Sequence, residues 1–488
     1  MAISFNQIPN GIRVPFAYIE LDNTGANTGT ALQTYRSLLI GQKLAAGTTP
    51  ALTPTRITSA QQAATMFGAG SMLHNMAEAY FANNSFTETW AVALDDNGAH
   101  VQATTTVVVA GTPSAAGTLA LYIAGRLVQV GVSTVSTATT IATALAAAIN
   151  ANTSLPVTAT SSTGTVTITA KHRGIIGNGI DLRLNYAGET TPAGLTVTVN
   201  TMASGSGNPD LTTVWAAIAA NQYHIIANPY TDTTSLGALE SELVRRAGPL
   251  VQQDGMAFSA VAGNFAAATG LGAGRNNQFS SIMATNGSPS PVYEWAAAVA
   301  GDVAFYGQID PARPFKTLTI GFVRPGLPAV RFSLSERDQL LKSGISTHVV
   351  GIDGTIQIER LITTYQTSPL GVVDPSYLDV NTLLTLSYLR FDTRTMLLSK
   401  YPRHKLANDG TRYGPGQAIV TPKTVKAELI NRARQWEELG LVENAEGFKS
   451  GLIVERNAQD ATRLDILLSP DLVNQLQVMG VQIKFILQ

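Results

Sequence analysis

The 488-residue chain contains no cysteine, so disulfide bridges, thiolate metal ligands and cysteine nucleophiles are excluded together. Charged residues are also scarce, because Asp, Glu, Lys and Arg make up 13% of the chain, about half of the usual share. The net charge of −1 provides no excess of Lys and Arg for phosphates or anionic lipids. We therefore expect no nucleic-acid partner, and surfaces rich in Ala, Gly and Thr that are largely covered by something else.

Long apolar runs are missing as well. No segment approaches the roughly eighteen consecutive apolar residues of a membrane-spanning helix, and the first ten residues lack the basic and apolar regions of a secretion signal. The sequence therefore predicts no membrane insertion, and assembly in a reducing cytoplasm. A hydrophobic share of 45% and the length of the chain favour about three domains with a large core.

Alternating helix and strand patterns predict a mixed α/β, multidomain fold. In residues 25–98, Ser59 and Ser71 are placed to cap two helices, and Trp90–Leu94 is typical of a short buried strand. The segment 208–370 has helices predicted at 215–220, 236–247, 293–305 and 335–343, and strands at 224–229, 256–262, 347–352 and 355–360. This order favours a mainly parallel sheet that helices cover.

Residues 99–207 differ in character from the segments around them. Between 99 and 200 there are twenty-one threonines and only six charged residues. Alternating β-branched runs predict strands at 104–110, 118–123, 127–132, 165–170, 181–186 and 195–200. Hairpin turns are expected at Ala124-Gly125 and Thr163-Gly164, one helix at 139–150, and a linker at Ser204–Pro209. We predict a small β-rich domain inserted into the α/β body.

The region 371–480 contains a strong helix signal. Thr421 is the predicted cap and Pro422 the first turn of a helix that ends before Gly440. Its apolar stripe consists of Val425, Leu429, Ala433 and Trp436, and its charged face of Lys423, Lys426, Arg432, Arg434, Glu437 and Glu438. Paired strands at 452–456 and 463–468, and a short helix from Ser469 to Met479, are predicted to follow.

Both ends of the chain have the pattern of apolar, extended strands. The residues that define these two arms are Val14, Phe16, Tyr18, Val481, Ile483, Phe485 and Leu487. A strand needs a neighbour for its backbone N–H and C=O groups. Each arm therefore either pairs within its own domain or adds to a sheet in another copy of the chain. The sequence leaves both interpretations open.

Groups with catalytic or metal-binding chemistry are few. The histidines are His74, His100, His172, His224, His348 and His404, and none stands at metal-ligand spacing from another. His224 and His348 belong to apolar strands, so we interpret them as structural. Asp95 and Asp96 are adjacent on a predicted turn, and we expect solvated carboxylates that point apart. No metal and no cofactor is predicted.

The segment Gly270–Gly274 is the glycine-rich stretch that suggests a nucleotide. It follows the strand at 256–262, but it lacks the full GxGxxG pattern and the Lys-Ser/Thr pair of a P-loop. We therefore prefer a flexible loop. A nucleotide-binding α/β enzyme remains the alternative from a different class, without an assembled nucleophile, base or metal set to support it.

Several strings of residues resemble the contractile tail sheath proteins of Mu-like bacteriophages. The most specific is Tyr401–Gly410 followed by Ile419–Lys423. The other matching strings are Ile3–Asn6, Ile12–Pro15, Tyr18–Glu20, Phe67–Leu73, Arg456–Asp460, Arg463–Asp465 and Pro470–Asn474. The resemblance spans both ends of the chain and is weakest over 99–200.

This resemblance implies a structural protein of the virion tail, assembled in the host cytoplasm, and not an enzyme. Such a protein stacks as hexameric rings into a helical sleeve around a tail tube and contracts to drive the tube through the host envelope. The implied partners are other copies of the chain, the tail tube protein, and the baseplate and tail terminator proteins. In the family, terminal arms of neighbouring subunits complete a sheet in the assembly domain.

The resemblance also implies a division of the chain. The parts are an N-terminal arm (1–24), an α/β segment (25–98), the inserted domain (99–207), an α/β domain of subtilisin-like topology (208–370), an assembly domain (371–480) and a C-terminal strand arm (481–488). Candidate contacts with the tube or a neighbour are Lys423, Lys426, Arg432, Arg434 and Glu437, unless they form a solvated helix face. Arg403–Lys405 has the same two interpretations.

Two further rivals remain at this point. A sheath of a phage-derived bacteriocin or other injection machine has the same sequence features as a virion sheath. A surface adhesin is suggested by the Thr-rich β domain, but it requires a secretion route.

Overall fold

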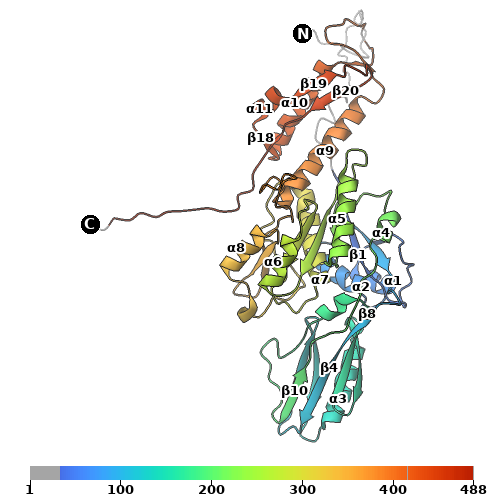
Figure 1. The fold of residues 1–488 in the computed structure, drawn as a ribbon, viewed down its shortest axis with the longest axis vertical. Coiled ribbons are helices and arrows are strands. Elements are labelled where there is room, and N and C mark those ends of the chain that lie inside the picture. Colours follow the sequence, from blue (N-terminus) through green and yellow to red (C-terminus); the bar gives the residue numbers. More distant parts are fainter. Residues whose placement is uncertain (1–32, 415, 487–488) are drawn as a thin grey trace, which may run out of the picture. The chain divides into compact units, whose positions relative to one another are not determined.

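A computed structural model describes residues 33–414 and 416–486 (Figure 1). Its contacts divide into two compact units. One, here called the body, consists of Thr34–Tyr388 and Asn474–Gln488; the other, here called the C-terminal unit, contains Leu389–Val473. The predicted N-terminal arm with Val14, Phe16 and Tyr18, and also Leu487, lie outside the described residues.

The body is organised around a six-stranded sheet in the order β13-β12-β11-β1-β3-β2, among the residues that the structure describes. Its strands are β1 (Arg36–Gln42), β2 (Thr55–Ile57), β3 (Glu88–Leu94), β11 (Ile225–Ala227), β12 (Met256–Val261) and β13 (Ser280–Ala284). Every neighbouring pair is parallel except β2 with β3. The central strands consist almost wholly of buried residues, because a sheet covered on both faces has no solvent side. The predicted parallel sheet is confirmed.

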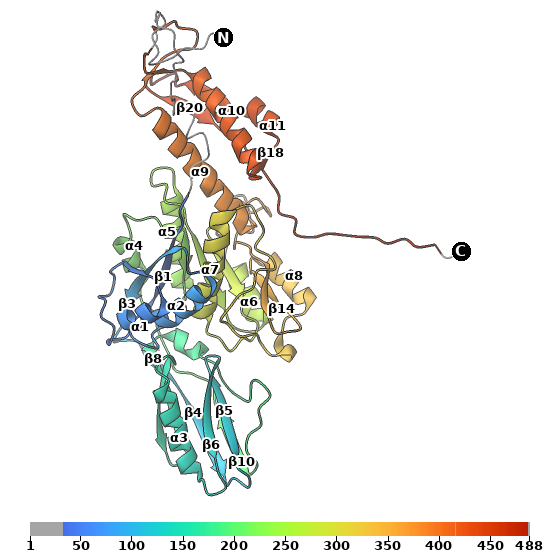
Figure 2. The same ribbon diagram turned by 180° about the vertical axis from the view of Figure 1, so that it is seen from behind.

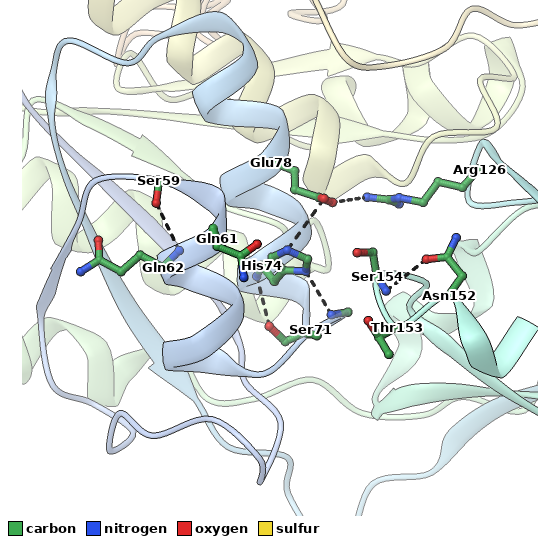
Figure 3. A network of polar contacts seen from close by, with 12 residues as sticks. Ser59, Gln61, Gln62, Ser71, His74, Glu78, Arg126, Asn152, Thr153 and Ser154 are labelled. Atoms are coloured by element: carbon green, nitrogen blue, oxygen red, sulfur yellow. Dashed lines mark hydrogen bonds and ion pairs between the residues drawn. The ribbon is translucent and has the colours of Figure 1, made fainter.

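Helices cover both faces of this sheet. They are α1 (Ala60–Phe67), α2 (Met72–Asn83), α4 (Thr212–Ala217), α5 (Thr233–Ala247), α6 (Phe265–Ala273), α7 (Val292–Ile309) and α8 (Leu334–Lys342). Figures 1 and 2, drawn from opposite sides, show α1, α2 and α7 on one face and α5 and α6 on the other. The predicted caps of α1 and α2 are confirmed, because Ser59 accepts the N–H of Gln62 and Ser71 that of His74 (Figure 3).

The predicted flexible loop at Gly270–Gly274 is wrong, because most of it lies in helix α6. Asn264 caps this helix by accepting the N–H of Ala267. A Cβ on Gly272 would lie 2.0 Å from the carbonyl oxygen of Ser343, so glycine lets α6 approach the end of α8 closely. The following helix α8 begins at Leu334, one residue earlier than predicted, since Ser333 and Glu336 form its capping box.

Residues 99–207 form two further sheets with a core of their own. The strands are β4 (Gln102–Gly111), β5 (Gly117–Ile123), β6 (Arg126–Val132), β7 (Val157–Ser162), β8 (Thr165–Arg173), β9 (Leu182–Leu184) and β10 (Leu195–Val199), with helix α3 (Ala138–Ala151). All but β7 were predicted. Both predicted hairpin turns are confirmed, since Ala124-Gly125 and Thr163-Gly164 have positive φ throughout.

The predicted linker at Ser204–Pro209 is held by hydrogen bonds in its first half. Ser206 and Ala203 form bridges with Val101 and Thr104, and Asn178 exchanges two hydrogen bonds with Gly205. The entry and exit of the inserted segment are therefore joined to each other. The predicted strands at 347–352 and 355–360 are confirmed as β14 (Thr347–Val350) and β15 (Ile356–Arg360), which pair with each other in antiparallel fashion.

Helix α9 (Val380–Lys400), which was not predicted, begins in the body and continues into the C-terminal unit. The unit also contains β16 (Lys405–Leu406), β17 (Ile419–Val420), α10 (Pro422–Glu438), β18 (Val442–Glu443), α11 (Ala445–Gly451), β19 (Ile453–Arg456), β20 (Leu464–Leu467) and β21 (Asp471–Leu472). The predicted cap and apolar stripe of α10 are confirmed. The predicted helix at 469–479 is wrong, because Asp471 and Leu472 pair with β18 and residues 473–479 have no regular structure.

Candidate assembly surfaces

The described part of the C-terminal arm is an exposed segment without regular structure. In residues 481–486 neither a helix nor a strand is formed with other described residues. The apolar side chains are almost fully exposed: Val481 84%, Ile483 84%, Phe485 78% and Ile486 90%. The predicted strand is therefore absent from the described single chain, which leaves an apolar segment able to accept a partner strand.

A small hairpin in the C-terminal unit has open edges. Strands β19 and β20 pair with each other in antiparallel fashion, and no third described strand joins them. Ile453 and Leu467, which face each other across the pair, are 49% and 56% exposed. An exposed two-stranded ribbon is rarely stable alone and has backbone groups free to extend the sheet.

The charged face of α10 is largely exposed. Lys423, Arg434 and Glu437 are exposed and Lys426 is half-buried. Two of these side chains also have local contacts with α11: Arg434 lies 4.0 Å from Glu446, and Glu437 accepts the N–H of Ala445. The structure thus places four of the five candidate contact residues along one exposed side of a helix.

Arg432 is the exception and corrects the predicted charged face. It is 9% exposed, and its Nε lies 3.4 Å from the carboxylate of Asp392 on α9. The indole N–H of Trp436 donates to the same carboxylate at 2.7 Å. Arg432 therefore stabilises the packing of α10 against α9, because a buried carboxylate needs paired donors. In the other candidate group, Arg403, His404 and Lys405 are all exposed, and Lys405 begins β16.

Asp96 is a structural carboxylate, and its predicted place on a solvated turn is wrong. It accepts hydrogen bonds from the N–H of Arg173, from Gln42 and from Nδ1 of His172. Nε2 of His172 accepts the N–H of Met72, so the proton of the neutral ring is on Nδ1. Partial burial opposes ionisation, but these hydrogen bonds outweigh it and hold the pKa of Asp96 below its usual value.

A half-buried arginine joins the inserted segment to the body, and no local pattern in the sequence predicted this contact. Arg126 of β6 donates to Glu294 on α7 and to Glu78 on α2, each at 2.7 Å (Figure 3 shows Arg126, Glu78 and His74). Glu78 also lies 3.8 Å from His74. Burial raises the pKa of Glu294 to about 7, although the guanidinium opposes this rise. Lys171 of β8 adds hydrogen bonds to the carbonyl groups of Ala69 and Thr153.

The histidines at 224 and 348 are buried, as the sequence predicted. His224 accepts the N–H of Arg36 through Nδ1, and His348 donates to the carbonyl of Ala284. Burial lowers the pKa of each ring to about 4. No group of three or more His, Asp or Glu suited to a metal ion occurs in the part of the chain that the structure describes. The same residues include no helix with the length and apolarity to cross a membrane.

Comparison with known proteins gives these surfaces a context. The phage tail sheath protein central domain matches residues 204–364, and the phage tail sheath C-terminal domain matches residues 372–486. These matches define the class: a structural protein of contractile tails. Over all 488 residues, and over the whole relative, the chain is 43% identical to the Mu-like prophage FluMu tail sheath protein of Haemophilus influenzae.

The chain therefore belongs to the phage tail sheath family, as its resemblance to Mu-like sheaths predicted. It is a structural protein, and the alternative of a nucleotide-dependent enzyme is wrong. Among solved structures, a chain of the anti-feeding prophage baseplate has a TM-score of 0.52 at 11% identity, covering 98% of this chain and 100% of that one. The sheath tail protein of Desulfitobacterium hafniense has a TM-score of 0.48 at 11% identity, with coverage of 94% and 100%. At such low identity the likeness concerns the fold alone.

Proposed function

We propose that the chain stacks as hexameric rings into a helical sleeve around a tail tube, and that contraction of this sleeve drives the tube through the host envelope. Beyond membership of the family, one observation supports assembly of this chain into a sleeve. The segment 481–486 exposes four large apolar side chains and has no strand partner among the described residues. A chain with such a segment is incomplete until another surface covers it.

The surface that receives this arm is proposed to be the β19–β20 hairpin of a neighbouring copy. Strand addition pairs the backbone groups of both partners, at about 1 kcal/mol net per hydrogen bond. Burial of each large apolar side chain is worth roughly 1.5–3 kcal/mol. Ordering the arm opposes this gain by about 1–2 kcal/mol per residue. Each contact is therefore modest, and a sleeve gains its cohesion from many copies.

Contraction is proposed to be a movement of rigid bodies between two packings of different free energy. Head-to-tail contacts whose rotation does not close generate a helix, which is the symmetry of a sleeve. The strand arms keep neighbours connected while the bodies rotate, and no nucleotide is required. The proposed partners are the tail tube, baseplate and tail terminator proteins, in a virion tail assembled in the host cytoplasm.

The division of the chain into parts is proposed along the same lines. The separate core of residues 99–207 supports an inserted domain. The parallel sheet and its helices support an α/β domain at 208–370 that also takes in the described part of the segment 25–98, from residue 33 onward. Its subtilisin-like topology, the assembly domain at 371–480 and the two arms at 1–24 and 481–488 remain part of the proposal. On α10, Lys423, Lys426, Arg434 and Glu437 are proposed to contact the tube or a neighbour.

Deletion of residues 481–488 tests the proposed role of the arm. The truncated subunit is expected to remain folded, because residues 481–486 contribute no buried side chain, but to form no sleeves in negative-stain electron microscopy. Substitutions on the two faces of the arm supply a matched pair. Ile483→Asp with Phe485→Asp should abolish sleeves, whereas Gln482→Asp with Lys484→Asp should retain them. Normal sleeves from the truncated chain would reject strand exchange by this arm.

A sleeve in a contractile injection system is the second candidate. The likeness of the fold to a chain of the anti-feeding prophage baseplate supports it, and the relation to a Mu-like prophage sheath supports a phage tail. Genes for a capsid and portal beside the gene for this chain would decide for the virion.

A further inference from the structure

The last segment of the chain, from Asn474 onward and here called the extended C-terminal arm, has a docked root at residues 475–477 and an exposed part at 478–486. The ammonium group of Lys316 donates to the carbonyl oxygen of Leu476 and, at 3.3 Å, to that of Gln477. One residue earlier along the arm, the side chain of Gln475 donates to the carbonyl of Ala312 at 3.3 Å. All of these residues belong to the body, and within the described residues Lys316 has no carboxylate within ion-pair distance.

The loop that carries Lys316 is held firmly in place. The amide of Asn381 donates to the carbonyl groups of Pro311 and Arg313, at 2.8 and 2.7 Å. Phe315, next to Lys316, is buried, and the N–H of Thr317 donates to the carbonyl of Ile358 at 2.8 Å. A cation on such a loop is preorganised, so little entropy is lost when it binds two carbonyl groups.

Burial changes sharply where these contacts end. Residues 473, 475 and 477 are half-buried, whereas every described residue from 478 onward is exposed. Gly480 has no atom within 4 Å of the position that a Cβ would occupy. The arm therefore changes from docked to free between Gln477 and Val478.

We propose that Lys316 is the positioning residue that anchors the root of the extended C-terminal arm and thereby sets the point and direction from which the arm leaves the body. This inference rests on the proposed function, in which the arm pairs with a neighbouring copy. With the anchor in place, only residues 478–488 are available for pairing. A free segment of eleven residues reaches about 36 Å when extended, at roughly 3.3 Å per residue.

Loss of the anchor lengthens the free arm to its attachment in the C-terminal unit, where the N–H of Val473 donates to the carbonyl of Leu441. The released arm then has four more mobile residues and no defined direction. A longer and more mobile tether lowers the effective concentration of the end of the arm at the sheet that it pairs with. Pairing therefore becomes less favourable, although no contact within the pair is lost.

Substitution of Lys316 by methionine removes the charge and the donors but keeps a long side chain. Because the chain has no cysteine, Val478→Cys provides a single site for a nitroxide label directly beyond the root. We expect Lys316→Met to sharpen the electron paramagnetic resonance spectrum at position 478, to leave the melting temperature unchanged within about 1 °C, and to raise the protein concentration needed for sleeves several-fold. Lys316→Arg should keep both the spectrum at position 478 and the protein concentration needed for sleeves close to their wild-type values, because a guanidinium also donates to carbonyl groups.

Two controls separate the anchor from general effects of charge and from the arm itself. Lys342→Met removes one exposed lysine from α8 and should change neither readout. A nitroxide label at Phe485→Cys should be mobile both with the wild-type Lys316 and with Lys316→Met. Unchanged mobility of the label at position 478 in Lys316→Met would overturn the proposal that Lys316 anchors the arm. Raised mobility of this label together with normal sleeve formation would overturn it as well. Normal sleeves after deletion of residues 481–488 would instead reject the proposed function. In that case the spectrum of the label at position 478 would still show whether Lys316 holds the root of the arm.

Discussion

At the residue scale, the body of this protein buries neutral imidazoles that are expected to make its stability depend on pH. The ring of His348 is 3% exposed and lies 4.7 Å from the Trp295 ring, centroid to centroid. Its pKa is lowered to about 4 by burial, while an unfolded histidine titrates near 6.5. Below pH 6.5 the unfolded state therefore binds more protons than the folded state, so stability falls as the pH falls toward 4.

His348→Asn tests this dependence, since an amide can still donate to the carbonyl of Ala284 but does not titrate. In the wild-type subunit, the titration of His348 is expected to lower the free energy of unfolding by about 2 kcal/mol between pH 7 and pH 5. The variant should lose that part of the pH dependence, whatever its absolute stability. Urea unfolding of both proteins at the two pH values measures it. An identical pH dependence in the two proteins would contradict a neutral, buried ring at 348.

Two glycines of α6 provide a matched pair at the same scale. A Cβ at Gly270 meets no atom within 4 Å, whereas at Gly272 it would lie 2.0 Å from the carbonyl oxygen of Ser343. Gly270→Ala should stabilise the body by about 0.5–1 kcal/mol, because alanine is the better helix former. Gly272→Ala should destabilise it by about 1–3 kcal/mol, as overpacking does. Thermal unfolding decides, and equal effects would argue against the close approach of α6 to α8.

At the element scale, the junction between the inserted sheets and the body depends on a few buried polar groups. Arg126 reaches from β6 to carboxylates on both α2 and α7, and its Glu294 partner is 1% exposed. Such a pair contributes little net stability compared with apolar residues, yet loss of one partner leaves an uncompensated charge. The junction is thus sensitive to single changes.

Arg126→Met should therefore destabilise the subunit by about 3–5 kcal/mol. Glu294→Gln in the same chain should recover part of this loss, because it removes the unpaired buried carboxylate. Arg245→Met is the matched control, since Arg245 is exposed and its partner Glu242 keeps a second cation, Arg246, at 3.7 Å. Chemical unfolding of the three variants provides the measurement. Similar losses for Arg126→Met and Arg245→Met would show that the buried cluster does not hold the junction.

At the scale of the whole molecule, low charge limits how the subunit can interact electrostatically. With a net charge of −1, contacts over large areas depend on apolar and backbone groups, and charge acts only at local clusters. The exposed side of α10 is one such cluster, and its loss should affect the partner interface without affecting the fold.

Charge reversal at Lys423 and Lys426 together should weaken sleeve assembly around the tube at low salt, and the difference from wild type should shrink as salt screens the contact. The subunit itself should keep its melting temperature, because Lys423 is exposed and neither lysine belongs to the buried stripe of α10. Lys342→Glu with Lys449→Glu is the control with the same change of charge on other helices. Co-sedimentation of sleeves with tubes at two salt concentrations measures the effect. Unchanged assembly at low salt would indicate a solvated helix face.

Much of the fold was predictable where a local pattern decides the structure. The cap, first-turn proline and apolar stripe of α10, and the two positive-φ hairpin turns, are signals contained within a few residues. Helix α9 was missed because its threonines and mixed polarity give no clear stripe or cap. The false helix at 469–479 had a good start signal, but pairing of Asp471 and Leu472 with β18 outweighed it. Arg432 was placed on the wrong face since its buried partner, Asp392, lies on the missed helix.

By itself, the sequence determined the mixed α/β pattern, the inserted β-rich segment, the Mu-like sheath resemblance and the apolar alternation of the last residues. Only the tertiary structure decided which polar groups meet. Arg126 and Glu294 are 168 positions apart, and Lys316 and Leu476 are 160 apart, so no local pattern links them. The physical reason is that periodicity and capping depend on neighbours in the chain, whereas burial and ion pairing depend on how the chain folds back on itself.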